Sequence, residues 1–176
     1  MTTLRTERLV LRPPTLDDVE IAGELIGDER VMQFLGGDAV PREAWPAVVE
    51  KWIQRWDDNG MGAFLLEHDG RFVGRCGLLV WDPRTWTTTT LADAGELAQP
   101  ELGWALAYDA WGNGYATEAA RAVRDWARAE RDVTRLISVI APANVASRRV
   151  AERLGATPGE TVQLFDTGDA VVWEHP

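Results

Sequence analysis

The sequence predicts one domain of the mixed α/β or α+β class, spanning residues 1–176. Three observations indicate this class: a length typical of one domain, a hairpin of apolar strands in the first half, and alternating strand and helix patterns in the second. A chain of this length buries enough surface to build a core without disulfides. Strands that precede alternating strand–helix units favour a mixed sheet with helices packed against it.

The N-terminal part combines one strand with three helices. Residues 9–12 alternate between apolar and polar before two prolines, which indicates a short strand. Thr15 is a candidate cap for a helix over 16–26, whose apolar positions recur at helical spacing. Two further helices are predicted over 28–35 and 41–58, each followed by glycine.

The middle of the chain predicts a hairpin. Apolar strands over 63–67 and 72–81 flank a turn that contains Asp69-Gly70, a strong short-range hairpin signal. Residues 82–99 are polar and are interpreted as an irregular loop or as a ragged extension of this hairpin.

The second half alternates strands with helices and closes on a hairpin. The predicted strands are 102–108, 135–140, 161–165 and 170–174, and the predicted helices are 116–131 and 144–154.

Charge and composition exclude several classes of function. Eighteen Lys and Arg residues against 28 Asp and Glu give a net charge of −10, which argues against a nucleic-acid partner and against an anionic membrane surface. The charge is compatible with a cationic substrate such as an amine. One cysteine, Cys76, and two histidines leave few ligands for a metal site, so we expect no metal.

With no apolar run of about 18 residues and no export signal at the start, the sequence predicts a cytoplasmic protein.

Residues 111–117, Trp-Gly-Asn-Gly-Tyr-Ala-Thr, lie at the predicted turn from a strand into a helix. Glycines at such a turn let several backbone N–H groups point at one spot, where the helix N-terminus adds partial positive charge. The turn is therefore either a phosphate site or a tight turn that merely needs glycine.

Two other phosphate motifs are excluded here. A Walker loop needs Gly-Lys-Ser/Thr, and the one lysine of the chain is Lys51. A dinucleotide fingerprint needs a third glycine where Thr117 stands and an acid after the next strand, where Ile140-Ala141-Pro142 stands. Any phosphate site here is of another kind.

Four segments, taken in order, carry a family pattern. They are 6–13 (TERLVLRP), 101–104 (ELGW), 111–119 (WGNGYATEA) and 144–156 (NVASRRVAERLGA). Their order and spacing resemble those of GNAT-type N-acetyltransferases, closest to the RimJ/RimL-type branch that acetylates protein N-termini. The resemblance covers almost the whole chain.

The resemblance implies a fold and a reaction. The fold is a mostly antiparallel twisted sheet of about seven strands, with a splayed central pair and flanking helices. The reaction transfers an acetyl group from acetyl-CoA, the cosubstrate, to a primary amine in a ternary complex, without a metal. The acceptor is a protein N-terminus, a polyamine, an amino acid or an aminoglycoside, and the RimJ/RimL likeness favours an α-amino group. The protein is expected to be a monomer or a homodimer.

The resemblance also implies which residues bind acetyl-CoA. The pyrophosphate-loop pattern Gln/Arg-x-x-Gly-x-Gly/Ala falls on Trp111, Gly114 and Ala116, with Trp111 departing from it, so that backbone N–H groups are the expected ligands. Pantetheine is expected along the backbone edge of the strand at 104–106, and Asn144 matches a family Asn that reaches the cofactor. The full candidate set is Trp104, Ala105, Leu106, Trp111, Gly112, Asn113, Gly114, Tyr115, Ala116, Thr117 and Asn144.

Two residues are candidates for the chemistry. Glu101 matches a strand position that often holds the base which deprotonates the amine; the alternative is a solvated charge at a strand edge. Ser147 matches a serine near the leaving sulfur; the alternative is a serine that only caps or fills space at a helix start. A tyrosine acid used by many relatives is absent at its usual site, where Ala151 stands.

Two other classes of function stay open from the sequence: a non-catalytic module that binds acyl-CoA, and a different nucleotide-binding enzyme. A stripe formed by Trp45, Trp52 and Trp56 on one helix face predicts core packing, or a wall of the acceptor pocket for one of the three.

Overall fold

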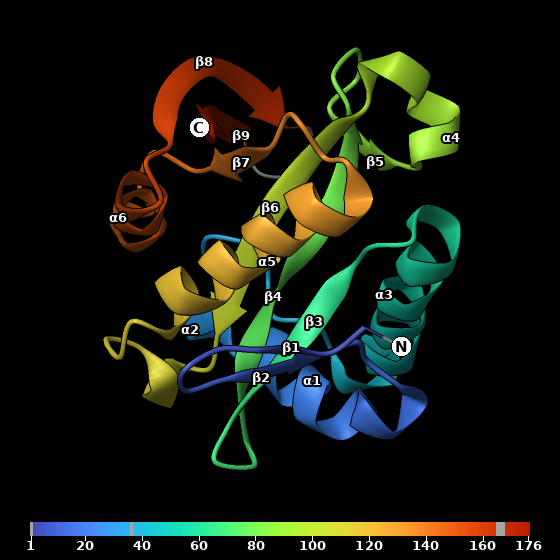
Figure 1. The fold of residues 1–176 in the computed structure, drawn as a ribbon. Helices are drawn as coiled ribbons and strands as arrows, with labels where there is room; N and C mark the ends of the chain where they lie inside the picture. The colour runs from blue at the N-terminus through green and yellow to red at the C-terminus, as the bar shows by residue number, and fades with distance from the viewer. Residues whose placement is uncertain (1, 36, 165–167) are drawn as a thin grey trace.

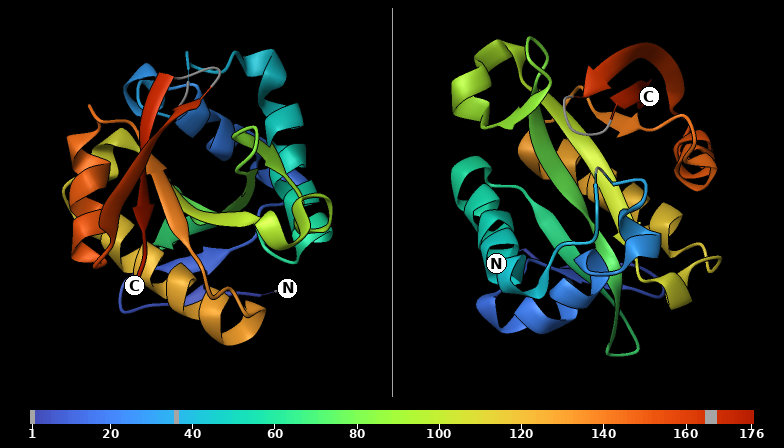
Figure 2. Two further views of the ribbon diagram at one scale, coloured as in Figure 1. Left: turned by 90° about the horizontal axis from the view of Figure 1, so that it is seen from above. Right: turned by 180° about the vertical axis from the view of Figure 1, so that it is seen from behind.

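A single twisted sheet runs through the molecule, with helices on both faces (Figures 1 and 2). The computed structural model describes residues 2–35, 37–164 and 168–176, and these form nine strands. The strands are β1 (Leu4–Arg5), β2 (Val10–Arg12), β3 (Ala63–His68), β4 (Arg71–Asp82), β5 (Thr87–Thr89), β6 (Gln99–Leu106), β7 (Ile137–Ile140), β8 (Thr157–Leu164) and β9 (Gly168–Glu174). Their order is β1-β2-β3-β4-β6-β7-β9-β8, with β5 paired to β4 off this path.

The helices form two layers. They are α1 (Val19–Ile26), α2 (Glu29–Met32), α3 (Trp45–Asn59), α4 (Leu91–Ala94), α5 (Tyr115–Arg131) and α6 (Val145–Arg153), with 3₁₀ turns at Leu16–Asp18, Arg42–Ala44, Gly95–Leu97 and Tyr108–Ala110. Helices α1 and α3 pack on one face of the sheet, whereas α5 packs on the opposite face with α6 beside it (Figures 1 and 2). None of the described helices combines the length and the apolar character needed to cross a membrane.

Strand β3 is buried on both faces over residues 63–66. Because side chains alternate along a strand, Phe64 and Leu66 join the core under α5, and Ala63 and Leu65 join the core under α1 and α3. A continuous apolar run is the composition expected for a strand covered on both sides.

Local signals explain most boundaries. Thr15 and Asp18 form a reciprocal capping box at the start of the first helical segment. Gly60 takes a left-handed conformation, with φ +66°, and ends α3. The hairpin between β3 and β4 turns at Asp69-Gly70, as predicted. The predicted glycine stop at residue 36, the end of the predicted strand at Phe165 and the first residue of the predicted closing turn, Thr167, lie outside the described residues.

The mixed α/β fold with a mostly antiparallel sheet confirms the predicted class. The described sheet has nine strands rather than about seven, because the short strands β1 and β5 pair at its margins. Within 82–99 the hairpin extension is the correct interpretation: β5 pairs back onto the end of β4, and α4 follows it.

The sheet splits between β6 and β7, its one parallel pair among the described strands. Their register contains a single pair, Glu101 with Ile137, after which the strands diverge. The hydroxyl of Ser138 donates to the Leu102 carbonyl at 2.6 Å and ties the strands at the point of divergence. Beyond it, residues 103–106 of β6 have no strand partner on the β7 side.

Candidate active site

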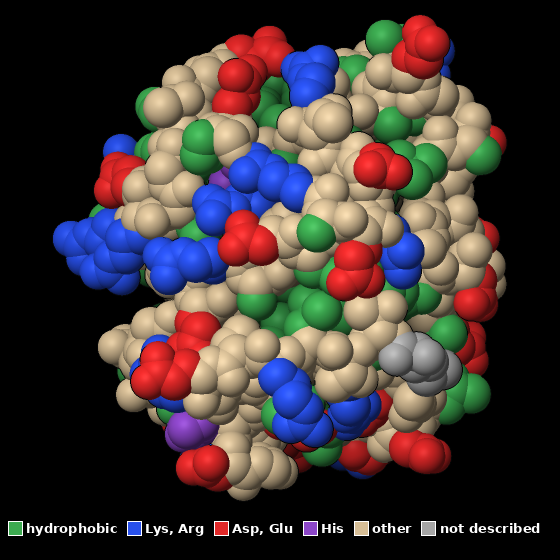
Figure 3. Space-filling view, viewed as in Figure 1, with side chains coloured by type: hydrophobic (Ala, Val, Ile, Leu, Met, Phe, Trp, Pro, Cys, Tyr) green, Lys and Arg blue, Asp and Glu red, His purple; other side chains and the backbone are tan. Residues whose placement is uncertain are grey.

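A cleft of about 690 Å³ opens where β6 and β7 diverge. Its walls come from α3, β4, β6, β7 and the start of α6. In Figure 3 the molecule is notched on its left side, between α6 and the segment that precedes α5, and Lys and Arg side chains gather along the upper side of the notch. Helix α6 carries Arg148, Arg149 and Arg153.

Glu101 is buried in the cleft wall and is held by two donors. The indole Nε1 of Trp81 donates to its Oε2 at 2.5 Å, and the backbone N–H of Val139 donates to its Oε1 at 3.2 Å. Burial raises the pKa of Glu101, while these hydrogen bonds and the charges of Arg75 and Arg55 act in the opposite direction. The solvated strand-edge charge is therefore the wrong alternative, because the side chain is 8% exposed.

Ser147 lies in the first turn of α6 and lines the same cleft. Its hydroxyl oxygen accepts a hydrogen bond from Trp104 Nε1 at 3.2 Å. The cap of α6 is Asn144, whose Oδ1 accepts from the Ser147 backbone N–H at 3.0 Å. The Ser147 hydroxyl is thus free of a capping role and points to the cleft side of the helix.

The loop before α5 has the backbone that the glycine pattern predicts. Gly112 and Gly114 have φ of +78° and +79°, in the left-handed region that favours glycine. Gly114 is the N-cap of α5 and carries no side chain to satisfy the first N–H groups of the helix. In the same turn, the buried Thr117 Oγ1 has no hydrogen-bond partner within the described chain. Unsatisfied donors and an orphaned hydroxyl at one helix N-terminus fit a bound phosphate group.

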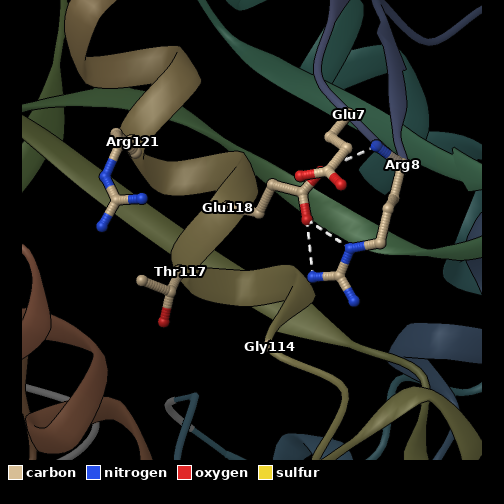
Figure 4. A pocket seen from close by; sticks show the side chains of 6 residues that line it. All are labelled: Glu7, Arg8, Gly114, Thr117, Glu118 and Arg121. Atoms are coloured by element: carbon tan, nitrogen blue, oxygen red, sulfur yellow. Dashed lines mark hydrogen bonds and ion pairs between the residues drawn. The ribbon is translucent and has the colours of Figure 1, made fainter.

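A second cavity, of about 480 Å³, adjoins this loop (Figure 4). Gly114, Thr117 and Arg121 contribute to it from α5 and its cap, and Arg8 faces them from the N-terminal segment. Arg8 pairs with Glu118, with Nε 2.7 Å from Oε2, and its Nη1 donates to the Asn113 carbonyl at 3.0 Å. These contacts hold the N-terminal segment around Arg8 against the loop before α5.

Several candidate cofactor residues line neither of these two cavities with their side chains. Ala105 and Leu106 pack in cores, and Tyr115 is buried against the sheet. Trp111 donates its indole N–H to the Leu106 carbonyl at 2.8 Å, and the Asn113 amide closes the turn onto nearby carbonyls. Gly112 can offer only backbone groups to a ligand, whereas the side chain of Trp111 is exposed and can also contact one.

The sequence reasoning missed two arginines that line the cleft, Arg55 from α3 and Arg75 from β4. The ring of Trp52 lies 5.2 Å from the Arg75 guanidinium carbon and supports it. For Arg75 the sequence did hold a signal, because it is a charged residue inside a largely apolar strand. Charged side chains are rarely buried unless they have a partner.

The tryptophan stripe is a core stripe, as predicted. Trp45 and Trp52 are buried between α1, α3 and β3, and Trp56 packs edge-on against Phe64 at 4.8 Å. Cys76 is also buried, and burial raises the pKa of its thiol to about 12, which suits a packing residue and not a nucleophile.

Residues 8–157 match the family described as "Acetyltransferase (GNAT) domain". The chain belongs to the GNAT acetyltransferase family. Among curated relatives, the uncharacterized protein YkkB of Bacillus subtilis is 33% identical over 175 residues, covering 97% of this chain and 94% of YkkB.

Two solved structures share the fold. An acetyltransferase from Agrobacterium tumefaciens is 31% identical with a TM-score of 0.80, over 100% of this chain and 95% of that one. RimL, a ribosomal L7/L12 α-N-protein acetyltransferase solved with coenzyme A, is 16% identical with a TM-score of 0.79, over 99% of this chain and 97% of RimL. At this identity the likeness to RimL shows a shared fold.

This GNAT protein is an N-acetyltransferase, which removes the non-catalytic module and the other nucleotide-binding enzymes from consideration. GNAT enzymes use acetyl-CoA. Within the described ranges, no three His, Cys, Asp or Glu side chains are grouped so that they would hold a metal ion.

Proposed function

We propose that this GNAT enzyme transfers the acetyl group of acetyl-CoA directly to a primary amine, with Glu101 as base and Ser147 as acid. One observation carries the proposal: Glu101 on β6 and Ser147 on α6 line the same cleft, which opens where the sheet splits. Direct transfer needs both groups beside the thioester carbonyl. The base acts on the amine nitrogen that forms the new bond, and the acid acts on the sulfur whose bond breaks.

Acetyl-CoA supplies the acetyl group as a thioester. The open N–H groups at Gly112–Thr117 and the orphaned Thr117 hydroxyl would hold its pyrophosphate. The backbone of residues 104–106 has no strand partner on the β7 side, although the Leu106 carbonyl accepts from Trp111, and this edge would receive the pantetheine arm. The Asn144 Nδ2 makes no hydrogen bond within the described chain, so it is available to the same arm.

Glu101 would remove a proton from the incoming ammonium group. An amine begins mostly protonated at neutral pH, since its pKa is about 8 for an α-amino group and about 10 for a lysine-type amine. A carboxylate with a raised pKa is a stronger base than an exposed one, which supports this role.

Ser147 would donate its proton to the departing sulfur while water returns a proton to the hydroxyl, so that no alkoxide is left. Its oxygen already accepts from the Trp104 indole, so the hydroxyl proton is left for another partner. The help required is modest, because a thiol has a pKa of only about 8.5.

The acceptor is proposed to be a protein N-terminal α-amino group or a small amine. RimL is named as an α-N-protein acetyltransferase, which supports the first choice by analogy of fold alone. The cytoplasmic location, the monomeric or homodimeric state and the single domain over 1–176 stay predictions.

The test is release of CoA from acetyl-CoA across a panel of amines and N-terminal peptides. We expect turnover with some of them, lost in Glu101→Gln and kept in Glu130→Gln, a matched change at an exposed position on α5. Intact-mass analysis after incubation with acetyl-CoA alone should show unmodified protein. A stable acetyl-enzyme, or equal rates for both variants, would refute the direct mechanism with Glu101 as base.

A further inference from the structure

Two arginines and one carboxylate meet in the inner part of the cleft. Arg55 from α3 and Arg75 from β4 line it together with Glu101. Both guanidinium groups are close enough to Glu101 for their positive charges to lower its pKa, and the charge of Arg55 also lowers the pKa of Arg75. Three elements distant in sequence therefore place two positive charges beside the proposed base.

Neither arginine has an ion-pair partner within 4.0 Å among the described residues, although nine ion pairs occur there. Both are partly withdrawn from water, and burial lowers the pKa of each. The Arg75 Nε is inaccessible to solvent and has no hydrogen-bond partner within the same residues. Desolvating a guanidinium group without a partner is unfavourable, so the arrangement is incomplete as it stands.

The charge of this inner region opposes that of the molecule. The chain has a net charge of −10, whereas two guanidinium groups face the single carboxylate of Glu101. The other titratable side chain that lines the cleft, Asp38, is exposed. One negative charge is therefore missing from the inner wall.

We propose that Arg55 and Arg75 bind a carboxylate carried by the acceptor itself, so that the substrate is an amino acid-type amine with its carboxylate a few bonds from the nitrogen. The inference rests on the proposed function, because it takes the amine to lie at Glu101. Guanidinium groups match carboxylates in planar, paired hydrogen bonds. Two such groups beside the base fix a short distance between the amine and the negative group.

The inference favours some of the acceptor amines that the sequence allows and disfavours others. A polyamine or an aminoglycoside brings further positive charges toward two arginines and is disfavoured. A free amino acid supplies its α-carboxylate, and a protein N-terminus supplies a carboxylate only when its first residue is acidic. Both sources present the same chemistry to the cleft.

Matched substrate pairs test the inference and separate its two sources. Each free amino acid is compared with its carboxamide, and peptides that begin with Asp or Glu are compared with those that begin with Asn or Gln. We expect kcat/KM to favour the acid of the preferred pair by about tenfold to a hundredfold, the range for hydrogen bonds to charged groups. In Arg55→Gln this preference should fall toward unity, because the rate with the acid falls much more than the rate with the amide, while the KM for acetyl-CoA is kept.

Arg42→Gln is the control variant, since Arg42 is exposed and pairs with Glu20 outside the cleft. Arg55 is the first choice for substitution because it lies on a helix surface, whereas Arg75 is set in the sheet. Equal rates for acid and amide in the native enzyme would overturn the proposal. An equal loss for both substrates in Arg55→Gln would also overturn it, because the arginine would then act only on Glu101.

A binding measurement keeps the inference separate from the proposed function. Tryptophan fluorescence is titrated with the N-acetylated amino acids and their carboxamides, with Trp52 and Trp81 as reporters near Arg75 and Glu101. Selective binding of the acids, lost in Arg55→Gln, would support the carboxylate site even if no amine is acetylated. Absence of that selectivity, with or without turnover, would overturn it.

Discussion

The indole N–H of Trp104 donates a 3.2 Å hydrogen bond to the hydroxyl oxygen of Ser147, joining the splayed strand β6 to helix α6. The bond orients the hydroxyl, because an oxygen that accepts from one side directs its own proton elsewhere. Trp104 is therefore a positioning residue for the proposed acid.

Ser147→Ala should lower kcat by about tenfold to a hundredfold and leave the KM for acetyl-CoA unchanged, since only protonation of the sulfur is lost. Steady-state kinetics with saturating acceptor measure both quantities. Trp104→Phe keeps the hydroxyl but removes its donor, so it should give a smaller loss. Full kcat in Ser147→Ala would mean that water protonates the thiolate.

Asn144 combines two tasks that two substitutions separate. Asn144→Ala removes the cap of α6 and should cost about 1 kcal/mol in unfolding free energy, besides raising the KM for acetyl-CoA. Asn144→Asp keeps the capping oxygen but lacks the Nδ2 donor, so it should raise the KM without the loss of stability. Denaturant unfolding and acetyl-CoA kinetics are measured on both. A normal KM in Asn144→Asp would contradict a role in binding acetyl-CoA.

The hydrogen bond from Trp81 should set the acid limb of the pH profile. Because this bond lowers the pKa of Glu101, its removal in Trp81→Phe leaves burial less opposed, and the pKa rises further. The fall of kcat/KM on acidification should then begin at higher pH than in the native enzyme, while a limb unmoved by Trp81→Phe would argue against Glu101 as base.

A second substitution is needed to separate the loss of stability in Glu101→Gln from its loss of activity. Both carboxylate oxygens accept from N–H donors, so a Gln amide must turn its NH₂ group toward one of them. We expect a loss of about 1–3 kcal/mol in stability. The double variant Glu101→Gln/Trp81→Phe removes one opposing donor and should recover stability but not activity.

Gly114→Val should weaken acetyl-CoA binding at least tenfold, because a branched side chain would project where backbone N–H groups face the ligand. Inside the protein there is room for it: a Cβ at this position meets only Arg8 Nη2, at 3.6 Å. Gly60→Val is the matched control, with φ +66° and open space at the end of α3. Calorimetric binding on both variants separates backbone strain from loss of the site, and equal affinities would place the pyrophosphate elsewhere.

His175 should make the fold acid-sensitive. Its Nε2 lies 2.9 Å from Ser138 Oγ, whose proton goes to Leu102, and its buried Nδ1 has no partner among the described residues. Burial, then the charges of Arg124 and Arg128, lower the pKa of His175 to about 4. The unfolded chain therefore binds more protons between pH 6.5 and 4, and stability should fall by about 2–3 kcal/mol as the pH drops from 7 to 4.

Unfolding in denaturant across this pH range checks the effect. The His175→Gln variant should lose the His175 part of the slope, whereas His68→Gln, at a partly exposed strand end, should keep it. Parallel slopes for His175→Gln and the native protein would refute the assignment.

Much of the fold was predictable because its signals are local. The capping residue Thr15, the Asp69-Gly70 turn and the apolar run of β3 each specify their element within a few residues. The short strand β5 was less predictable, because Thr87–Thr89 become a strand only by pairing with the end of β4.

The candidate site was predictable where a motif carries it and unpredictable where tertiary contacts create it. The loop glycines, Asn144 and Ser147 stand in recognisable patterns, and the structure places Asn144 and Ser147 on one cleft. Arg55 and Arg75 lie beside Glu101 only because α3, β4 and β6 pack together in the fold. No spacing in the sequence indicates that these three elements are neighbours.

The single registered pair between β6 and β7 has a consequence for how the molecule tolerates change. Ordinary ladder bonds belong to the backbone and survive almost any side-chain replacement. At this seam two of the crossing bonds come instead from the side chains of Glu101 and Ser138. Cohesion between the two halves of the sheet therefore depends on which side chains stand at these two positions. A single amino-acid substitution can remove a hydrogen bond between β6 and β7, whereas the backbone hydrogen bonds between the other strands do not depend on the side chain.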